Sequence, residues 1–184
     1  SEMCIRDRYL FLDGARLGYG LAAPDNDLTL PEIATLCDVF YIGGTKVGAL
    51  FGEAVVIKNP ELAQDFRYLI KQNGGMLAKG RLLGLQFDAL FTDGLYQEIS
   101  AHAIAMAEKL REAFTAKGYN YLAPNRTNQI FVIVPDAHLA KISEQFEYSY
   151  DQRIDATHSC VRFCTGWATK EENVDALIRC VEKL

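Results

Sequence analysis

The 184-residue sequence lacks several features that would assign it to a class directly. No apolar run reaches the roughly 18 residues that a membrane-spanning helix needs, so the membrane is not an expected partner. There is no glycine-rich dinucleotide or phosphate-loop motif, and no Gly-x-Ser-x-Gly nucleophile turn. The three histidines are scattered, and no group of His, Cys and Asp has the spacing of metal ligands. The sequence therefore predicts no metal site and no nucleotide site of these kinds.

Excess positive charge and paired cysteines are also missing. The net charge of −5 argues against nucleic acid as a partner. The five cysteines are odd in number and include no Cys-x-x-Cys pair, which favours reduced cysteines that fill the core of a cytoplasmic protein. Cys160 and Cys164 are four apart in a predicted strand, so they should point to the same face. Because 49% of the residues are hydrophobic and 23% are charged, the composition is that of an ordinary globular protein.

One lysine stands in a setting that solubility alone does not require. Lys46 lies in a loop of small residues between predicted strands at 39–42 and 54–57. The glycines of this loop, Gly43, Gly44 and Gly48, permit tight turns and the close approach of a ligand. A lysine that forms a covalent imine with a planar cofactor needs such a setting, and we interpret Lys46 in this way.

A carboxylate is predicted at the same rim. The apolar run at 9–12 ends abruptly at Asp13, so it is typical of a buried strand with an acidic residue at its carboxyl end. Ligands of open α/β sheets bind outside the carboxyl ends of the strands. Asp13 precedes Lys46 by about one strand–crossover–strand unit, which takes roughly 30 residues. A lysine for the imine and an aspartate for the pyridinium nitrogen are the groups that a pyridoxal phosphate enzyme needs most.

Three stretches carry a resemblance to a known family. They are LDGAR at 12–16, the loop around Lys46, and KQNGGM at 71–76. In order and spacing they resemble the low-specificity threonine aldolases, from about residue 9 to the end of the chain. That family belongs to the beta-eliminating lyase group of pyridoxal phosphate enzymes with the aspartate-aminotransferase-like fold. The resemblance implies an α/β fold class: the end of a large cofactor-binding domain, with a mostly parallel sheet and helices, followed by a small α+β domain.

The resemblance implies a role for five residues. Lys46 would hold the cofactor covalently, and Asp13 would face the pyridine nitrogen and keep the ring protonated. Arg16 would face the cofactor and the substrate carboxylate. Lys71 would lie near the cofactor phosphate, reaching from a neighbouring subunit. Arg162 would clamp the α-carboxylate of the substrate, because a guanidinium donates two parallel hydrogen bonds.

Each of these residues also has an ordinary interpretation. Lys46 and Arg16 could be solvated surface cations, and Asp13 could simply cap the Asp-Gly turn. Lys71 could interact with the dipole at a helix C-terminus, and Arg162 could face solvent in an alternating strand. The presence of Asp13, Lys46 and Arg162 together favours the cofactor site, since a decayed site would have no reason to keep all three residue types.

The pattern along the chain predicts the domains and their elements. Residues 1–8 have no period and are interpreted as a non-native leader, 9–118 as the end of the large domain, and 119–184 as the small domain. Residues 17–27 are predicted as a loop, and helices are predicted at 59–72, 77–91, 95–117 and 136–146. Strands are predicted at 130–134, 146–150 and 160–164. Capping boxes are expected at Thr29–Glu32 and at Thr169–Glu172, where the last helix begins.

The predicted reaction is the retro-aldol cleavage of threonine or allo-threonine to glycine and acetaldehyde. The rivals are another pyridoxal phosphate reaction on this fold, such as β-elimination or transamination, and a non-catalytic relative. The family's phosphate loop and ring-stacking histidine do not occur in the sequence, so we expect the start of a larger protein to be missing and the 184 residues alone to be inactive. The resemblance also implies a homo-oligomer, a dimer or tetramer, with an amino acid as substrate.

Overall fold

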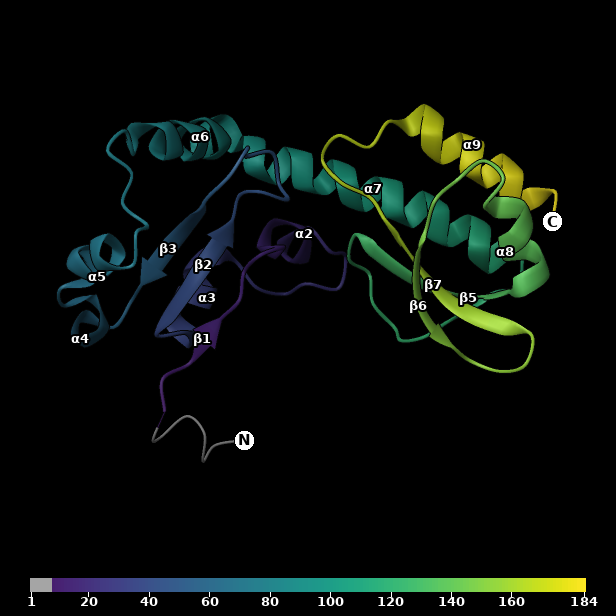
Figure 1. The fold of residues 1–184 in the computed structure, drawn as a ribbon, viewed down its shortest axis with the longest axis horizontal. Coiled ribbons are helices and arrows are strands. Elements are labelled where there is room, and N and C mark those ends of the chain that lie inside the picture. Colours follow the sequence, from purple (N-terminus) through teal and green to yellow (C-terminus); the bar gives the residue numbers. More distant parts are fainter. Residues whose placement is uncertain (1–7) are drawn as a thin grey trace. The chain divides into compact units, whose positions relative to one another are not determined.

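The computed structural model describes residues 8–184 (Figure 1). The expected leader, residues 1–8, lies outside this range apart from Arg8, and Cys4 lies outside it as well. The described residues form two compact units, 8–21 with 26–98 and 22–25 with 99–184. Their boundary at Glu98 lies near the start of the long helix α7, Leu95–Ala116, whereas the expected domain boundary follows that helix. The domain assignment stays a prediction.

The first unit is built on a three-stranded sheet. Its strands are β1 (Phe11–Leu12), β2 (Val39–Gly43) and β3 (Glu53–Ile57), in the order β1-β2-β3. β1 runs parallel to β2, with Leu12 opposite Phe40, as the strand–crossover–strand spacing predicts. β3 is antiparallel to β2 and returns directly from the loop that contains Lys46.

Two helices make the crossover between β1 and β2. α3 (Leu30–Leu36) begins with the expected capping box: the Thr29 hydroxyl accepts from the amide of Glu32, whose carboxylate accepts from the Thr29 amide at 2.7 Å. α2 (Leu17–Leu21) was expected to be loop, and that prediction is wrong. Its two glycines suggested a loop, but they lie in a short helix that opens with a bond from the Leu17 amide to the carbonyl of Gly14.

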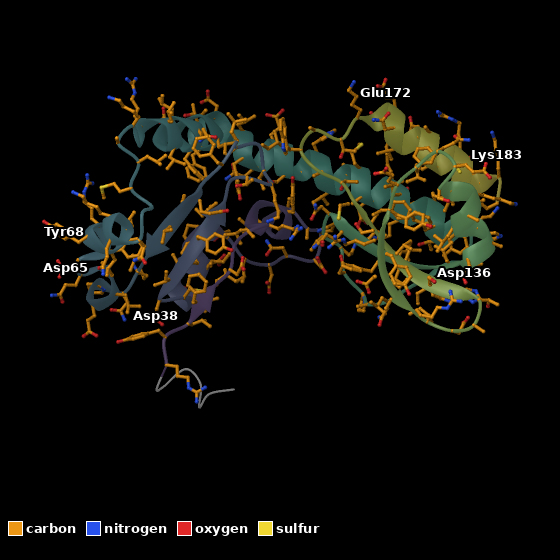
Figure 2. The ribbon with its side chains drawn as sticks, viewed as in Figure 1. Asp38, Asp65, Tyr68, Asp136, Glu172 and Lys183 are labelled. Carbon is orange, nitrogen blue, oxygen red and sulfur yellow. The ribbon has the colours of Figure 1, made fainter. Side chains whose placement is uncertain are left out.

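The helices after β3 are shorter than their patterns predict. The helix expected at 59–72 divides into α4 (Pro60–Ala63) and α5 (Phe66–Gln72). Asp65, labelled in Figure 2, takes a left-handed conformation with φ of 56° between them, and this interrupts the helical hydrogen bonds. α6 begins at Arg81 rather than at residue 77 and ends at Phe91, and a 3₁₀ turn, η1 (Thr92–Gly94), leads into α7.

The second unit has an antiparallel sheet. Its strands are β4 (Asn120–Tyr121), β5 (Gln129–Pro135), β6 (Ser149–Arg153) and β7 (His158–Cys164), in the order β4-β5-β7-β6. β4 was not predicted, and β6 begins later than expected. α8 (Asp136–Ile142) follows β5 and ends four residues before the predicted end, and α9 (Glu171–Glu182) closes the unit.

Burial alternates along β5 and gives this sheet two different faces. Ile130, Val132 and Val134 are fully buried, whereas Phe131 and Ile133 between them, and Gln129 before them, are partly exposed. The buried face packs against α7, α8 and α9 (Figure 1). Besides the three buried residues of β5, the core contains Met106, Ala107, Leu110, Phe114, Leu139, Ile142, Val161, Phe163, Val174, Leu177 and Val181. The other face of the sheet carries both apolar and polar side chains, among them Phe131, Ile133 and Arg162.

Two expectations in the second unit are wrong. Thr169 does not cap α9: its hydroxyl accepts from the Gly166 amide at 2.8 Å, and Lys170 occupies the cap position. The cysteines do not all fill a core, because Cys164 is exposed at the end of β7 while Cys160 is buried. All four cysteines of the described part are free thiols.

Residues 8–184 contain neither a membrane-spanning helix nor a cluster of metal-binding side chains. None of these helices combines the length and apolar character needed to cross a membrane. Within the same range, no cluster of three or more His, Cys, Asp or Glu side chains could hold a metal ion.

Candidate active site

The carboxyl ends of β1 and β2 bring Asp13 and the Lys46 loop to one rim of the first unit. The amide of Gly43, at the end of β2, donates to the carbonyl of Gly14, just after β1, at 2.9 Å. The Asp13 carboxylate lies on the surface and accepts from the Tyr41 hydroxyl and from the Ala15 amide at 3.0 Å. These two bonds, followed by the charges of Lys46 and Arg16, hold the pKa of Asp13 below its usual value of 3.8.

The two strand ends approach so closely that side chains are excluded between them. A Cβ atom on Gly14 would lie 1.7 Å from the carbonyl oxygen of Tyr41, and one on Gly43 would lie 2.4 Å from the carbonyl oxygen of Ala15. Any larger residue would force the backbones apart. The glycines in the two motifs are thus required by the packing that places Asp13 beside the loop.

The loop presents Lys46 on a fixed turn. The amides of Val47 and Ala49 both donate to the carbonyl of Gly44, at 2.9 and 3.0 Å. Val47 is fully buried and anchors the turn, whereas Lys46 is exposed. Gly48 has a φ of 94°, which other residues rarely adopt. The lysine is therefore an accessible amine on a short, anchored turn.

Two buried tyrosines hold this turn and the end of β2, and no sequence motif indicated either of them. The Tyr19 hydroxyl donates to the carbonyl of Lys46. The Tyr96 hydroxyl accepts from the Gly18 amide at 3.1 Å and donates to the carbonyl of Gly43 at 3.0 Å. Burial raises the pKa of Tyr96 to about 12, so this hydroxyl keeps its proton at neutral pH.

The side chains at this rim suit pyridoxal phosphate. An accessible lysine can bind an aldehyde carbon, and a carboxylate with a lowered pKa can face a protonated ring nitrogen. Arg16 is half-buried and close enough for its charge to lower the pKa of Asp13. The donor set thus fits this cofactor.

Lys71 lies at a separate concavity of the first unit. It occupies the last turn of α5 and lines a pocket of about 830 Å³ together with Arg67 and Arg81. Three cations around one pocket suit an anionic group such as a phosphate. Interaction with the dipole of α5 remains a sufficient reason for a cation at Lys71 itself.

Arg162 lies in the second unit, on the face of the sheet opposite the core. Its guanidinium lies over the ring of Phe131, 6.0 Å from the centroid, and donates to Gln129 at 3.2 Å and to Ser149 at 3.5 Å. Its Nε is buried without a hydrogen-bond partner. The expectation of a simple solvated arginine therefore does not describe it, because neighbouring side chains hold its guanidinium in place.

The structure brings together Asp13, Arg16 and Lys46 of the predicted set. Lys71 lies elsewhere in the first unit, and Arg162 lies in the second unit. Gln129 and Phe131 were missed, as were the tyrosines. The two-residue period of a strand places Gln129 and Phe131 on the same face of β5, but the continuous apolar run after Gln129 gives no signal of which face lies outside the core.

Comparison with known proteins finds similarity to threonine aldolases. The low-specificity L-threonine aldolase of a Pseudomonas species is 30% identical over 141 residues, which are 76% of this chain and 40% of that protein. A structure of Leishmania major threonine aldolase has 40% sequence identity and a TM-score of 0.95, over 99% of this chain and 54% of that one. The chain is similar to the low-specificity threonine aldolases. The resemblance stated from the sequence motifs is thereby confirmed.

The similarity to threonine aldolases has limits in coverage. The chain spans about half the length of the relatives that it matches. No family model matches the sequence. An aspartate aminotransferase mutant from Thermus thermophilus, 15% identical, has a TM-score of 0.65 over 100% of this chain and 50% of that one. This likeness concerns the fold alone, and it confirms the predicted α/β fold class.

Proposed function

We propose that this chain carries the cofactor-binding lysine and carboxylate of a pyridoxal phosphate-dependent aldolase. The reaction would be the retro-aldol cleavage of threonine or allo-threonine to glycine and acetaldehyde. The observation that carries the proposal is the convergence of Asp13 and Lys46 at the ends of the parallel strands β1 and β2, in a chain similar to threonine aldolases. Because the chain spans about half of those relatives, the complete activity would belong to a longer protein.

The chain's residues would divide the work at the rim. Lys46 Nζ would bind the cofactor and release it to the amino group of the substrate. Bound pyridoxal phosphate supplies the electron sink that accepts the pair left on Cα when Cα–Cβ breaks. Asp13 is ionised at neutral pH, and the hydrogen bonds that lower its pKa favour this charged form, so its carboxylate would hold a proton on the ring nitrogen. This residue would thereby keep the sink effective throughout the reaction.

Arginines would orient the substrate. Arg162 would bind the α-carboxylate through its Nη groups, exchanging the bonds that it makes to Gln129 and Ser149. Arg16 would provide a second positive charge beside Asp13. Lys71, with its pocket of cations, would bind the cofactor phosphate of a neighbouring subunit, which makes a dimer or tetramer part of the proposal. A cytoplasmic location would suit the free thiols of the described residues.

Borohydride trapping tests the proposal. The natural full-length protein that contains these residues is mixed with pyridoxal phosphate and reduced, and the labelled peptide is mapped. We expect label on Lys46 in the wild type, no label in Lys46→Arg, and unchanged labelling in Lys58→Arg, a matched exposed lysine of the same unit. Label scattered over many lysines, or no label on folded protein, would contradict the proposal.

The products distinguish the reaction from its rivals. Glycine and acetaldehyde from threonine would support the aldolase, whereas pyruvate or ammonia would indicate elimination or transamination. We also expect the 184 residues alone to show no turnover. Activity of the isolated chain would overturn that part of the proposal.

A further inference from the structure

The two oxygens of the Asp13 carboxylate have different surroundings. Oδ1 accepts two hydrogen bonds, one from the Tyr41 hydroxyl and one from the Ala15 amide at 3.0 Å. Among residues 8–184, no hydrogen bond to Oδ2 is found. A carboxylate held through one oxygen has a fixed plane and presents its other oxygen in a defined direction.

Tyr41 is well placed to fix that direction, because its own position is determined by the sheet. It lies in β2, the central strand, and is paired with Val55 of β3. Its ring packs against the ring of Phe11 in β1, with centroids 5.9 Å apart. The carbonyl of Tyr41 faces Gly14, at the closest approach of β1 and β2. The phenol therefore spans from the central strand to Asp13, the residue that follows β1.

Both partners keep the protonation states that this bond needs. The bond to Asp13 is the largest of the effects that raise the pKa of Tyr41 to about 12, so the phenol remains a donor well above neutral pH. The same bond is the largest of the effects that lower the pKa of Asp13, so the carboxylate remains an acceptor. The other charged groups that act on the pair are Lys46 and Arg16 beside Asp13, and Glu53 beside Tyr41.

We propose that Tyr41 is a positioning residue for the cofactor site: by donating to Oδ1 of Asp13 it leaves Oδ2 to accept a hydrogen bond from the protonated ring nitrogen of the cofactor. Tyr41 acts through Asp13 and does not touch the reacting atoms. The inference rests on the proposed function, because it assigns Asp13 to the ring nitrogen. It adds a residue that no motif in the sequence identified.

The first measurement needs no cofactor. The carboxyl carbon of Asp13 is titrated by NMR in the 184-residue chain, in the wild type, in Tyr41→Phe and in Tyr68→Phe. The phenylalanine at 41 keeps the ring that packs on Phe11 and removes only the hydroxyl. We expect the pKa of Asp13 to rise toward 3.8 in Tyr41→Phe and to stay unchanged in Tyr68→Phe, whose phenol is exposed.

The second measurement uses the natural full-length protein loaded with pyridoxal phosphate. We expect Tyr41→Phe to weaken cofactor affinity about tenfold, the effect of losing one charge-assisted hydrogen bond. We also expect the pH dependence of the visible absorption of the bound cofactor to shift, because the ring nitrogen loses part of its support. A purely structural role would change stability without shifting this pH profile.

The outcomes separate the inference from the proposed function. If Lys46 is trapped in all three proteins but Tyr41→Phe matches the control in Asp13 titration, cofactor affinity and pH profile, the inference is overturned and the function stands. If Lys46 is not trapped in the wild type, the proposed function fails and the inference falls with it. A shift of the pKa, the affinity and the profile in Tyr41→Phe alone would support both.

Discussion

Removing the Tyr96 hydroxyl should loosen the first unit at the point from which the Lys46 loop begins. In Tyr96→Phe the ring remains, but the Gly18 amide loses its acceptor and the Gly43 carbonyl loses its donor. Both glycines are buried, and Tyr96 itself is 1% exposed, so water cannot replace the lost bonds without a rearrangement. Since Gly43 opens the turn that presents Lys46, the substitution should affect both stability and the site.

The structure sets the size of the effect. A typical hydrogen bond contributes about 1 kcal/mol net, and a buried group left unpaired costs about 1 to 3 kcal/mol. Two such groups lose the Tyr96 hydroxyl, so we expect the free energy of unfolding of the first unit to fall by roughly 2 to 6 kcal/mol. With a urea dependence of about 1 to 2 kcal/mol per molar, the midpoint should fall by about 1 M or more.

Urea unfolding, followed by a signal from the first unit, measures this difference. Tyr68→Phe is the matched control, because it removes a phenol hydroxyl from the same unit where the side chain is 73% exposed (Figure 2). We expect the control to stay within roughly 0.5 kcal/mol of the wild type, as most surface substitutions do. If Tyr96→Phe also stays within that range, the bridge does not stabilise the unit and the reasoning is refuted.

Five further substitutions test the packing, the charges and the site. Gly14→Ala should strongly destabilise the first unit by forcing its Cβ into a backbone carbonyl, while Gly84→Ala, in open space on α6, should be neutral or stabilising by up to about 1 kcal/mol in the same urea assay. Phe114→Ala should destabilise the second unit by about 3 to 5 kcal/mol in calorimetry, because this side chain is fully buried. Burial raises the pKa of Glu108, but hydrogen bonds from two arginines outweigh burial and leave the pKa below 4.5. The ionised carboxylate therefore stabilises the second unit above pH 4.5, and this contribution is lost as the pH falls through the lowered pKa. Glu108→Gln should thus lower the free energy of unfolding by its full amount above pH 4.5, and the difference from the wild type should vanish at lower pH. Under the proposed function, Arg162→Lys in the natural full-length protein should raise KM for the amino acid about tenfold with a smaller change in kcat, since lysine cannot donate two parallel bonds.

Much of the fold could be predicted from the pattern of apolar residues and from the spacing between predicted elements. The apolar run at 130–134 predicted a strand, and the structure gives one at Gln129–Pro135. The apolar stripe that begins at Leu95 predicted the long helix to within one residue of its end. The parallel pairing of β1 with β2 followed from the length of the crossover. These signals are strong because each arises from many residues that bury the same face.

The errors arose where a single local conformation decides the structure. Asp65 adopts a left-handed conformation that divides one predicted helix into two, and nothing in an apolar stripe records it. Thr169 has a capping sequence, but its hydroxyl accepts from Gly166 instead, because the turn before α9 brings that amide closer. A hydroxyl can serve any donor or acceptor within reach, so only the folded chain shows which one it takes.

The candidate site likewise contains residues that the sequence indicated and residues that it did not. Asp13 and Lys46 could be found from sequence because their glycine neighbours are unusual, and the structure gives the reason: Gly14 and Gly43 lie where no Cβ fits. The tyrosines that hold the site could not be found, since Tyr19, Tyr41 and Tyr96 look like ordinary aromatic residues of apolar segments. Each acts through a hydroxyl whose partner lies 27 or more residues away in the chain. The small residues around Asp13 and Lys46 therefore indicate these candidate site residues in the sequence. The tyrosines that contact them can be identified only once the strands are paired.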